Sequence, residues 1–171
     1  KNISIGEKMK ELKIYFAAPL FTQAQRIWNR ILKQKLEKTA KIQGLKIKIL
    51  FPQDIADKIL KNDKYSEKEK MTLLNNMLSN TIYDVDIMIS ILDGADSESG
   101  TSFETGGAKF LKKKIIGVRT DFRRSGEERG LNLVLSRALD KFVYFPSFNE
   151  NVDELAEKIV EKIKKLYINN I

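Results

Sequence analysis

Residues 85–107 read VDIMISILDGADSESGTSFETGG and join a strand pattern to a helix pattern. The first eight residues form a short apolar run rich in isoleucine, which predicts a β-strand buried on both faces. An acidic turn rich in serine and glycine follows, and then a segment that can begin a helix carrying Glu104. In open α/β sheets, ligands bind at the carboxyl ends of the strands. The acidic turn is therefore a candidate binding site.

Strand and helix patterns alternate on both sides of this segment. We expect strands at residues 13–18, 45–51, 85–92, 114–119 and 142–145. We expect helices at residues 23–41, 66–82, 102–112, 131–138 and 152–167. Such alternation needs crossover connections, which predict a parallel sheet with helices on both faces. The predicted fold is a doubly wound, five-stranded α/β sheet of the flavodoxin or Rossmann type, with residues 1–171 forming a single domain.

Local signals set some of the helix boundaries. Gly44 is expected to end the helix over residues 23–41, and Ser66 and Glu69 have the spacing of a capping box at the start of the next helix. The helix over 23–41 carries an apolar stripe that we expect to face the sheet, made of Ile27, Trp28, Ile31, Leu32 and Leu36.

The composition limits the chemistry available to the chain. Its 171 residues are enough for one domain with a full core. The chain has no cysteine and no histidine, which excludes thiolate catalysis, cysteine-based zinc sites and the commonest general base. Catalysis would have to use carboxylates, hydroxyls, tyrosine, lysine or arginine.

Charge and hydropathy bear on partners and location. The net charge of +8 suggests nucleic acid as a possible partner. However, the lysines lie on predicted helix faces, and the sequence contains no RNA-binding motif of aromatic and basic residues. We therefore expect no nucleic-acid partner. No apolar run approaches the roughly 20 residues that span a bilayer, and residues 1–13 lack the apolar core of a secretory signal. We expect a cytoplasmic protein with no membrane contact.

Four predicted strand ends, with the loops that follow them, meet at the carboxyl edge of the sheet. They carry Tyr15 with residues 17–21, residues 52–54, residues 93–104 and residues 119–124. Aromatic rings, the amide of Gln53 and several carboxylates suit a ligand with a flat heterocycle and hydroxyls. No Walker-type phosphate loop occurs, and Gly106-Gly107 lies too late in its helix for a dinucleotide fingerprint.

Four motifs in this order make the chain resemble the nucleoside 2-deoxyribosyltransferases. They are KIYFAAPLFTQAQRIWN at 13–29, FPQD at 51–54, LDGADSESGTSFETGGA at 92–108, and GVRTDFRR at 117–124 with GLNLVL at 130–135. The resemblance implies an enzyme of nucleoside salvage that exchanges the base of a 2′-deoxynucleoside for a free nucleobase, without cofactor or metal. It implies that Glu104 is the nucleophile, which forms a covalent glycosyl ester as in retaining glycosidases.

The resemblance also implies roles for other residues. Tyr15 matches a tyrosine whose hydroxyl holds the nucleophilic carboxylate. Glu98 stands where the family usually has an aspartate that binds the sugar. Asn132 matches an asparagine that reaches into a neighbouring subunit's site, which implies a homo-oligomer with shared active sites. The positions implied to contact substrate are Phe21, Gln53, Asp93, Glu98, Gly100 and Asn132.

One position departs from the family pattern. The family usually has an Asp or Asn for proton transfer to the base eight residues before the acid matching Asp86, where this chain has Leu78. Asn80 is the nearest polar side chain and takes the role if the helix is two residues shorter than usual. If nothing replaces the group, transfer would be slow or limited to bases that leave easily.

Several alternatives stay open at this point. Glu104 can have a purely structural role, in which its charge stabilises the helix dipole. Asn132 can be only a helix cap and Asp93 only a loop cap. Two other functions fit the chain. One is an N-glycosidase that hydrolyses deoxynucleosides or their 5′-monophosphates, with Arg119, Arg123 and Arg124 near the phosphate. The other is a non-catalytic nucleotide-binding module, which Leu78 and Glu98 favour.

Overall fold

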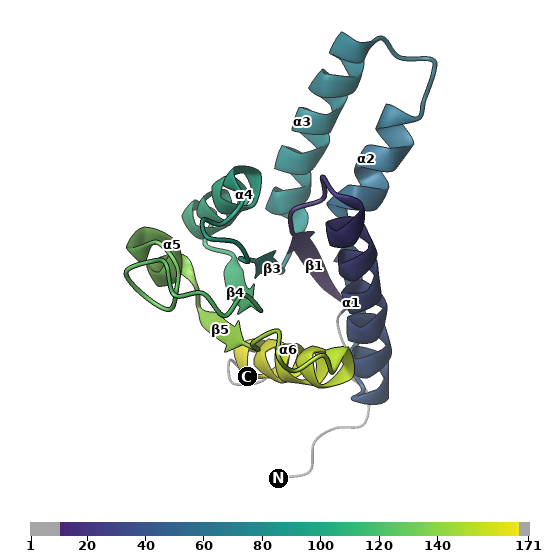
Figure 1. Cartoon of the computed structure of the whole chain (residues 1–171). Coiled ribbons are helices and arrows are strands. Elements are labelled where there is room, and N and C mark those ends of the chain that lie inside the picture. Colours follow the sequence, from purple (N-terminus) through teal and green to yellow (C-terminus); the bar gives the residue numbers. More distant parts are fainter. Residues whose placement is uncertain (1–10, 168–171) are drawn as a thin grey trace.

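A computed structural model describes residues 11–167 (Figure 1). In this part of the chain the strands are β1 (Leu12–Ala17), β2 (Ile47–Leu50), β3 (Ile87–Ile91), β4 (Lys114–Arg119) and β5 (Lys141–Tyr144). All pair in parallel in the order β2-β1-β3-β4-β5. The helices are α1 (Gln23–Ile42), α2 (Pro52–Leu60), α3 (Glu67–Asp84), α4 (Ser99–Phe110), α5 (Leu133–Ala138) and α6 (Val152–Tyr167). This strand order is that of flavodoxin-like sheets, so the predicted fold is confirmed.

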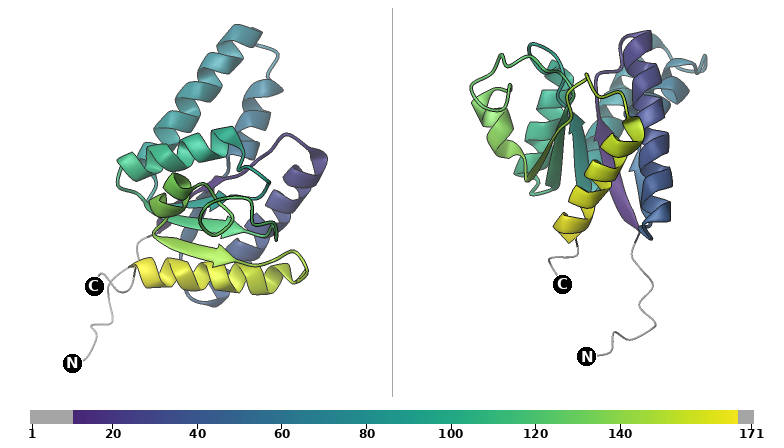
Figure 2. Two further views of the ribbon diagram at one scale, coloured as in Figure 1. Left: turned by 60° about the vertical axis from the view of Figure 1, so that its left-hand side comes forward. Right: turned by 60° about the horizontal axis from the view of Figure 1, so that its bottom comes forward.

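Helices cover both faces of the sheet (Figure 2). α1 and α6 pack together on one face, and α3 and α4 lie on the other, with α2 beside α3 and α5 beside α4. Alternate residues of β1 point to opposite faces. Ile14 and Phe16 therefore join the core under α1 and α6, whereas Tyr15 and Ala17 join a smaller core under α3 and α4.

Several sequence signals act as predicted. β4 and α6 have the expected bounds. Gly44 follows the end of α1 with a φ of 74°, a conformation that glycine adopts without steric cost. Ser66 and Glu69 form the expected capping box: the Ser66 side chain accepts from the Glu69 amide, and the Glu69 carboxylate accepts from the Ser66 amide at 2.8 Å.

The helices differ from expectation at α2, α4 and the buried face of α1, and α5 begins two residues later than expected, at Leu133. α2 was not expected; Pro52 occupies its first turn, where the fixed φ of proline suits a helix. α4 begins at Ser99 and not at residue 102, because the Glu98 side chain caps its first amides. In α1, Ile27 and Ile31 are exposed, since the buried face is the one turned to α6 and the sheet, which contains Leu32, Leu36 and Ala40.

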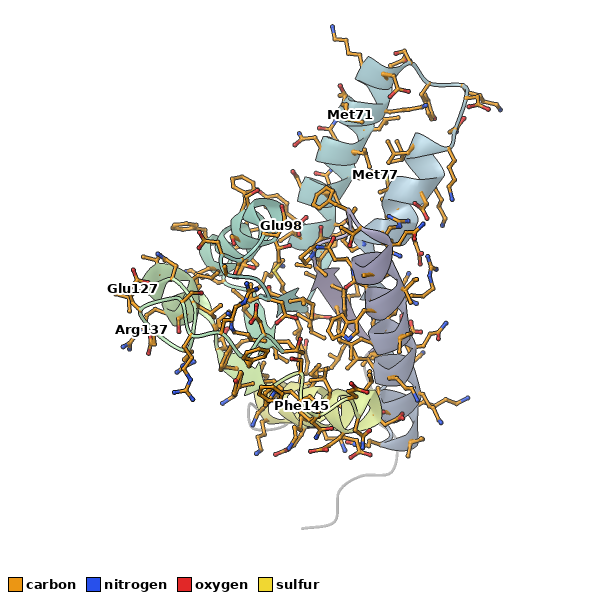
Figure 3. The ribbon with its side chains drawn as sticks, viewed as in Figure 1. Met71, Met77, Glu98, Glu127, Arg137 and Phe145 are labelled. Carbon is orange, nitrogen blue, oxygen red and sulfur yellow. The ribbon has the colours of Figure 1, made fainter. Side chains whose placement is uncertain are left out.

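The hairpin of α2 and α3 extends beyond the sheet (Figure 1). α3 buries just Lys70 and Ile82 of its 18 residues. Met71 and Met77 are exposed on this projecting part (Figure 3). Within residues 11–167, no helix has both the length and the apolar character needed to cross a membrane.

Candidate active site

Tyr15 and Glu104 meet between β1 and α4. The Tyr15 hydroxyl donates a hydrogen bond of 2.6 Å to Glu104 Oε1. Tyr15 is fully buried, because its position in β1 directs the ring into the core under α3 and α4. Glu104 Oε2 accepts no hydrogen bond from residues 11–167, so one carboxylate oxygen is held and the other is free. Two residues far apart in the sequence are thus brought together at the site.

The surroundings of Glu104 change its acidity. The pKa of this carboxyl is raised to about 7. Burial is the main cause, the hydrogen bond from Tyr15 acts in the opposite direction, and the negative charge of Glu98 adds to the rise. Burial and the charge of Glu104 also raise the pKa of Tyr15, so its hydroxyl keeps its proton. With its pKa near neutrality, both the protonated and the ionised form of Glu104 are accessible around pH 7.

Glu98 caps the first turn of α4 (Figure 3). Its carboxylate accepts hydrogen bonds of 2.8 Å from the amides of Gly100 and Thr101, and one of 2.9 Å from the Thr101 hydroxyl. Burial opposes the charge on Glu98, but these hydrogen bonds outweigh it and hold its pKa below the usual range. In this structure Glu98 and the amide of Gly100, both expected to contact substrate, therefore bind each other.

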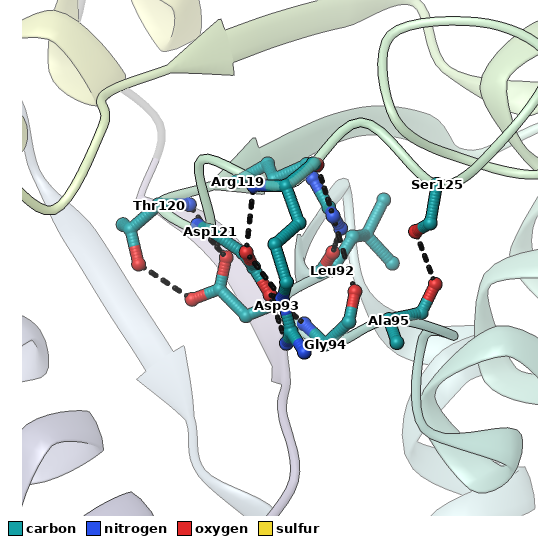
Figure 4. Close-up of polar contacts among 9 residues, drawn as sticks. Leu92, Asp93, Gly94, Ala95, Arg119, Thr120, Asp121 and Ser125 are labelled. Carbon is teal, nitrogen blue, oxygen red and sulfur yellow. Dashed lines mark hydrogen bonds and ion pairs between the residues drawn. The ribbon is translucent and has the colours of Figure 1, made fainter.

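Asp93 fixes the loop that follows β4 (Figure 4). Its carboxylate accepts from the Thr120 amide at 2.5 Å, from the Thr120 hydroxyl at 2.6 Å and from the Asp121 amide at 2.9 Å. Asp93 thus acts as a loop cap, the plainer of the two roles considered for it. It ties the turn after β3 to the loop after β4.

Arg119, which was expected with Arg123 and Arg124 in the loop at residues 119–124, belongs to the same network. It is the last residue of β4 and 1% exposed. Its guanidinium donates to the carbonyl oxygens of Leu92 at 2.6 Å, Gly94 at 3.1 Å and Arg123 at 3.0 Å (Figure 4). No sequence signal distinguished it from the exposed Arg123 and Arg124, because its partners are backbone oxygens of loops.

Phe21 and Gln53 lie in the loops after β1 and β2. Phe21 is exposed, just before the capping residue of α1. Gln53 is 1% exposed; its Nε2 donates to the Arg26 carbonyl at 3.1 Å, and its Oε1 is buried without a partner among the described residues. Asn29, which the sequence did not single out, is buried and holds the first loop by donating to the Pro19 carbonyl at 2.8 Å.

α3 does not bring Asn80 to Glu104. Leu78 packs against the apolar cluster that contains Tyr15. Asn80 is two residues further, which places it roughly 160° away around the helix. It is exposed and lines a separate cavity of about 440 Å³ with Lys13 and Lys48. In this structure Asn80 therefore lies away from Glu104, and the expectation that it replaces the missing acid stays a prediction.

Asn132 caps α5 and lies on the far side of α4 from Glu104. Its Oδ1 accepts from the amides of Val134 at 3.0 Å and Leu135 at 3.4 Å. It lines a cavity of about 540 Å³ that also includes Ser102 of α4. Ser102 and Glu104 are two residues apart, so their side chains point roughly 160° apart around the helix. The Asn132 of one chain is therefore remote from the Glu104 of the same chain.

No metal site is apparent in the described part of the chain. Within residues 11–167, the carboxylates do not form a group of three or more that would hold a metal ion.

Comparisons with known proteins identify relatives of this arrangement. The family model described as nucleoside 2-deoxyribosyltransferase matches residues 14–135. A conserved protein from Enterococcus faecalis V583 is 24% identical, with a TM-score of 0.66 over 90% of this chain and 99% of that one. A 2-deoxyribosyltransferase from Bacillus psychrosaccharolyticus is 21% identical, with a TM-score of 0.63 over 84% of this chain and 90% of that one. These two structures share the fold. No curated protein sequence matches the chain.

The contact between Tyr15 and Glu104 predicts the result of a simple substitution. Tyr15→Phe keeps the buried ring and removes the hydroxyl. Because the hydrogen bond lowers the pKa of Glu104, this pKa should rise above about 7 in the variant. Carbon NMR titration of the glutamate carboxyl groups measures it, with Glu104→Gln to assign the signal. Tyr83→Phe, which changes an exposed tyrosine, should leave the titration as it is. An unchanged pKa in Tyr15→Phe would contradict the role of the hydroxyl.

Proposed function

Because the chain belongs to the nucleoside 2-deoxyribosyltransferase family, we propose that it moves the deoxyribosyl group of a 2′-deoxynucleoside from one nucleobase to another. The nucleophile in this proposal is Glu104. The observation that carries it is the 2.6 Å hydrogen bond from Tyr15 to Glu104 Oε1, which orients a partly ionised carboxylate and leaves Oε2 free. Such an exchange would serve the salvage of nucleosides.

The reaction proceeds in two displacements. Glu104 Oε2 forms a bond to the anomeric carbon while the bond from that carbon to the base nitrogen breaks, and the base leaves with the electron pair. A nitrogen of the second base then attacks the same carbon and displaces the carboxylate. The first base takes up a proton and the second gives one up, so the proton count is unchanged. Two inversions retain the configuration of the sugar.

The source of the proton limits the choice of base. Leu78 supplies no acid at the family position, and Glu98 is a poor donor because its pKa is lowered. In this proposal the departing base takes its proton from water. Bases that are stable as anions should therefore leave fastest.

Phe21 and Gln53 suit the recognition of the base. The exposed ring of Phe21 is free to stack on a heterocycle. The unpartnered Oε1 of Gln53 is an acceptor for a base N–H group, and pairing it would remove the cost of a buried, unsatisfied oxygen. Neither contact requires a metal or a cofactor.

We further propose that two subunits share each active site. On α4, the side chain of Phe103 is 83% exposed and that of Phe110 is 89% exposed. Gly106 and Gly107 lie between them in the helix, and no atom of the described residues occupies the space where their side chains would be. A second copy packed on this face would bury both rings. It would also bring its own Asn132 toward Glu104, which the Asn132 of the same chain does not approach.

A base-exchange assay tests the reaction. The protein is mixed with a deoxynucleoside and a different free base, and the products are separated by chromatography. We expect the new deoxynucleoside to appear, and Glu104→Gln to lose at least about a thousandfold in rate because it removes the nucleophile. Glu157→Gln, which changes an exposed glutamate of α6, is the matched control and should keep full activity. Release of free deoxyribose in place of exchange would indicate an N-glycosidase, and binding without turnover a nucleotide-binding module.

The raised pKa of Glu104 predicts the pH dependence of the exchange. Below its pKa the carboxyl is protonated and cannot attack, so kcat/KM should fall about tenfold for each pH unit below neutrality. Above its pKa of about 7 the group is ionised and the rate should level off. Initial rates across the neutral range measure this profile, and circular dichroism checks that the fold persists. A rate that is flat or falls as the pH rises through 7 would contradict the assignment.

Mixing two inactive variants tests the shared site. Glu104→Gln lacks the nucleophile, and Asn132→Ser removes the amide while serine still caps α5. Each should be nearly inactive alone. In mixed dimers one site of the two combines Glu104 with an intact Asn132, so random mixing should restore about a quarter of the wild-type rate. Full activity of Asn132→Ser alone, or no recovery on mixing, would show that subunits do not share the site.

A further inference from the structure

A cavity of about 380 Å³, lined by aromatic and charged side chains, lies on the loop between β4 and α5, beside the edge strand β5. Arg124 and Arg129 line it together with Phe142 and Tyr144. Neither Tyr15 nor Glu104 belongs to its lining. Figure 3 shows Glu127, another of its lining residues, in the loop beside α5.

The backbone at Arg129 is strained. Arg129 has a φ of 59° and Gly130 a φ of 76°, between Glu128 and Leu131, whose backbones exchange hydrogen bonds of 3.1 and 2.9 Å. This is the geometry of a two-residue hairpin turn that normally favours Asn-Gly. An arginine in the first position is strained, because a side chain with a Cβ atom is disfavoured in the left-handed conformation. The turn holds its guanidinium 5.4 Å from the centre of the Phe142 ring, at the cavity.

The cationic groups of the cavity are largely uncompensated. Arg124 forms no hydrogen bond or ion pair with any described residue, and the Arg129 guanidinium contacts the Phe142 ring. Arg123 is already paired with Asp121. The one carboxylate in the lining, that of Glu127, accepts a hydrogen bond of 3.1 Å from the Leu133 amide. Two guanidinium groups thus remain available for a negatively charged ligand.

A buried charge beneath the cavity adds to this potential. Arg119 is 1% exposed and forms no ion pair with a carboxylate of the described residues. Among residues 11–167, the Arg119 Nε atom has no hydrogen-bond partner. Gly130, which lines the cavity, lies next to it: a Cβ atom at Gly130 would be 3.0 Å from this nitrogen. A buried cation balanced by carbonyl oxygens alone makes the overlying surface attractive to anions.

The aromatic side chains in the cavity lining favour a ligand that contains an aromatic ring. Phe142 and Tyr144 are two residues apart on β5, so both face the same side of the sheet. The Phe142 ring is in contact with Arg129, whereas Tyr144 is 43% exposed. The cavity volume lies in the range of small-ligand sites. We propose that it binds a nucleoside monophosphate, with the phosphate on Arg124 and Arg129 and the base against Tyr144.

Calorimetric titration of the full chain tests this site. The probes are adenosine and uridine 5′-monophosphates, the two parent nucleosides and inorganic phosphate. We expect at least one monophosphate to bind in a saturable way, at least about tenfold more tightly than its nucleoside and than phosphate. Arg124→Ala and Arg129→Gly should each weaken this binding about tenfold. Glycine fits the left-handed turn, so Arg129→Gly removes the guanidinium without disturbing the backbone.

Arg137→Ala is the matched control. It removes an equal charge from α5, where Arg137 pairs with Glu128 outside the cavity lining, and should change the affinity less than about twofold. The proposal is overturned if neither monophosphate binds, or if phosphate or the nucleosides bind equally well. It is also overturned if Arg124→Ala and Arg129→Gly bind like the wild type, because the ligand then lies elsewhere, including the candidate active site.

Discussion

The hydrogen bond between Tyr15 and Glu104 needs β1 and α4 to lie in a fixed relation. The parallel pairing of β1 with β3 sets the position of Tyr15, and α4 is anchored on β3 by a buried contact of 2.8 Å between the hydroxyls of Ser90 and Thr105. Thr105 is the neighbour of Glu104, so this contact also limits rotation of the helix at the carboxylate. The acidity of Glu104 follows from the same packing, because burial is the largest cause of its raised pKa.

The fold could be predicted because its signals are local. Buried parallel strands such as β4 are apolar runs, and α6 has regular helical spacing, so both were found with their bounds. α2 was missed because no side chain caps its first turn and it is nine residues long. The buried face of α1 was misjudged at Ile27 and Ile31, since it depends on where α6 packs, which one segment of sequence does not contain.

Less of the candidate site than of the fold could be predicted from the sequence. The pairing of Tyr15 with Glu104 was expected from the family resemblance, and the family model confirms that resemblance. The roles of Glu98 and Arg119 were not foreseen, because both bind backbone groups whose positions are known only in the folded chain. The loop between β4 and α5 now has two features, a buried cation and a strained arginine, that the sequence alone did not reveal.

Mass spectrometry of the intact protein, quenched during turnover of a deoxynucleoside without acceptor base, tests the central claim most directly. The account predicts a mass increase of one deoxyribosyl group, located on the peptide that contains Glu104. Consumption of the deoxynucleoside with the sugar attached to a different residue, or with no sugar attached at all, would contradict it.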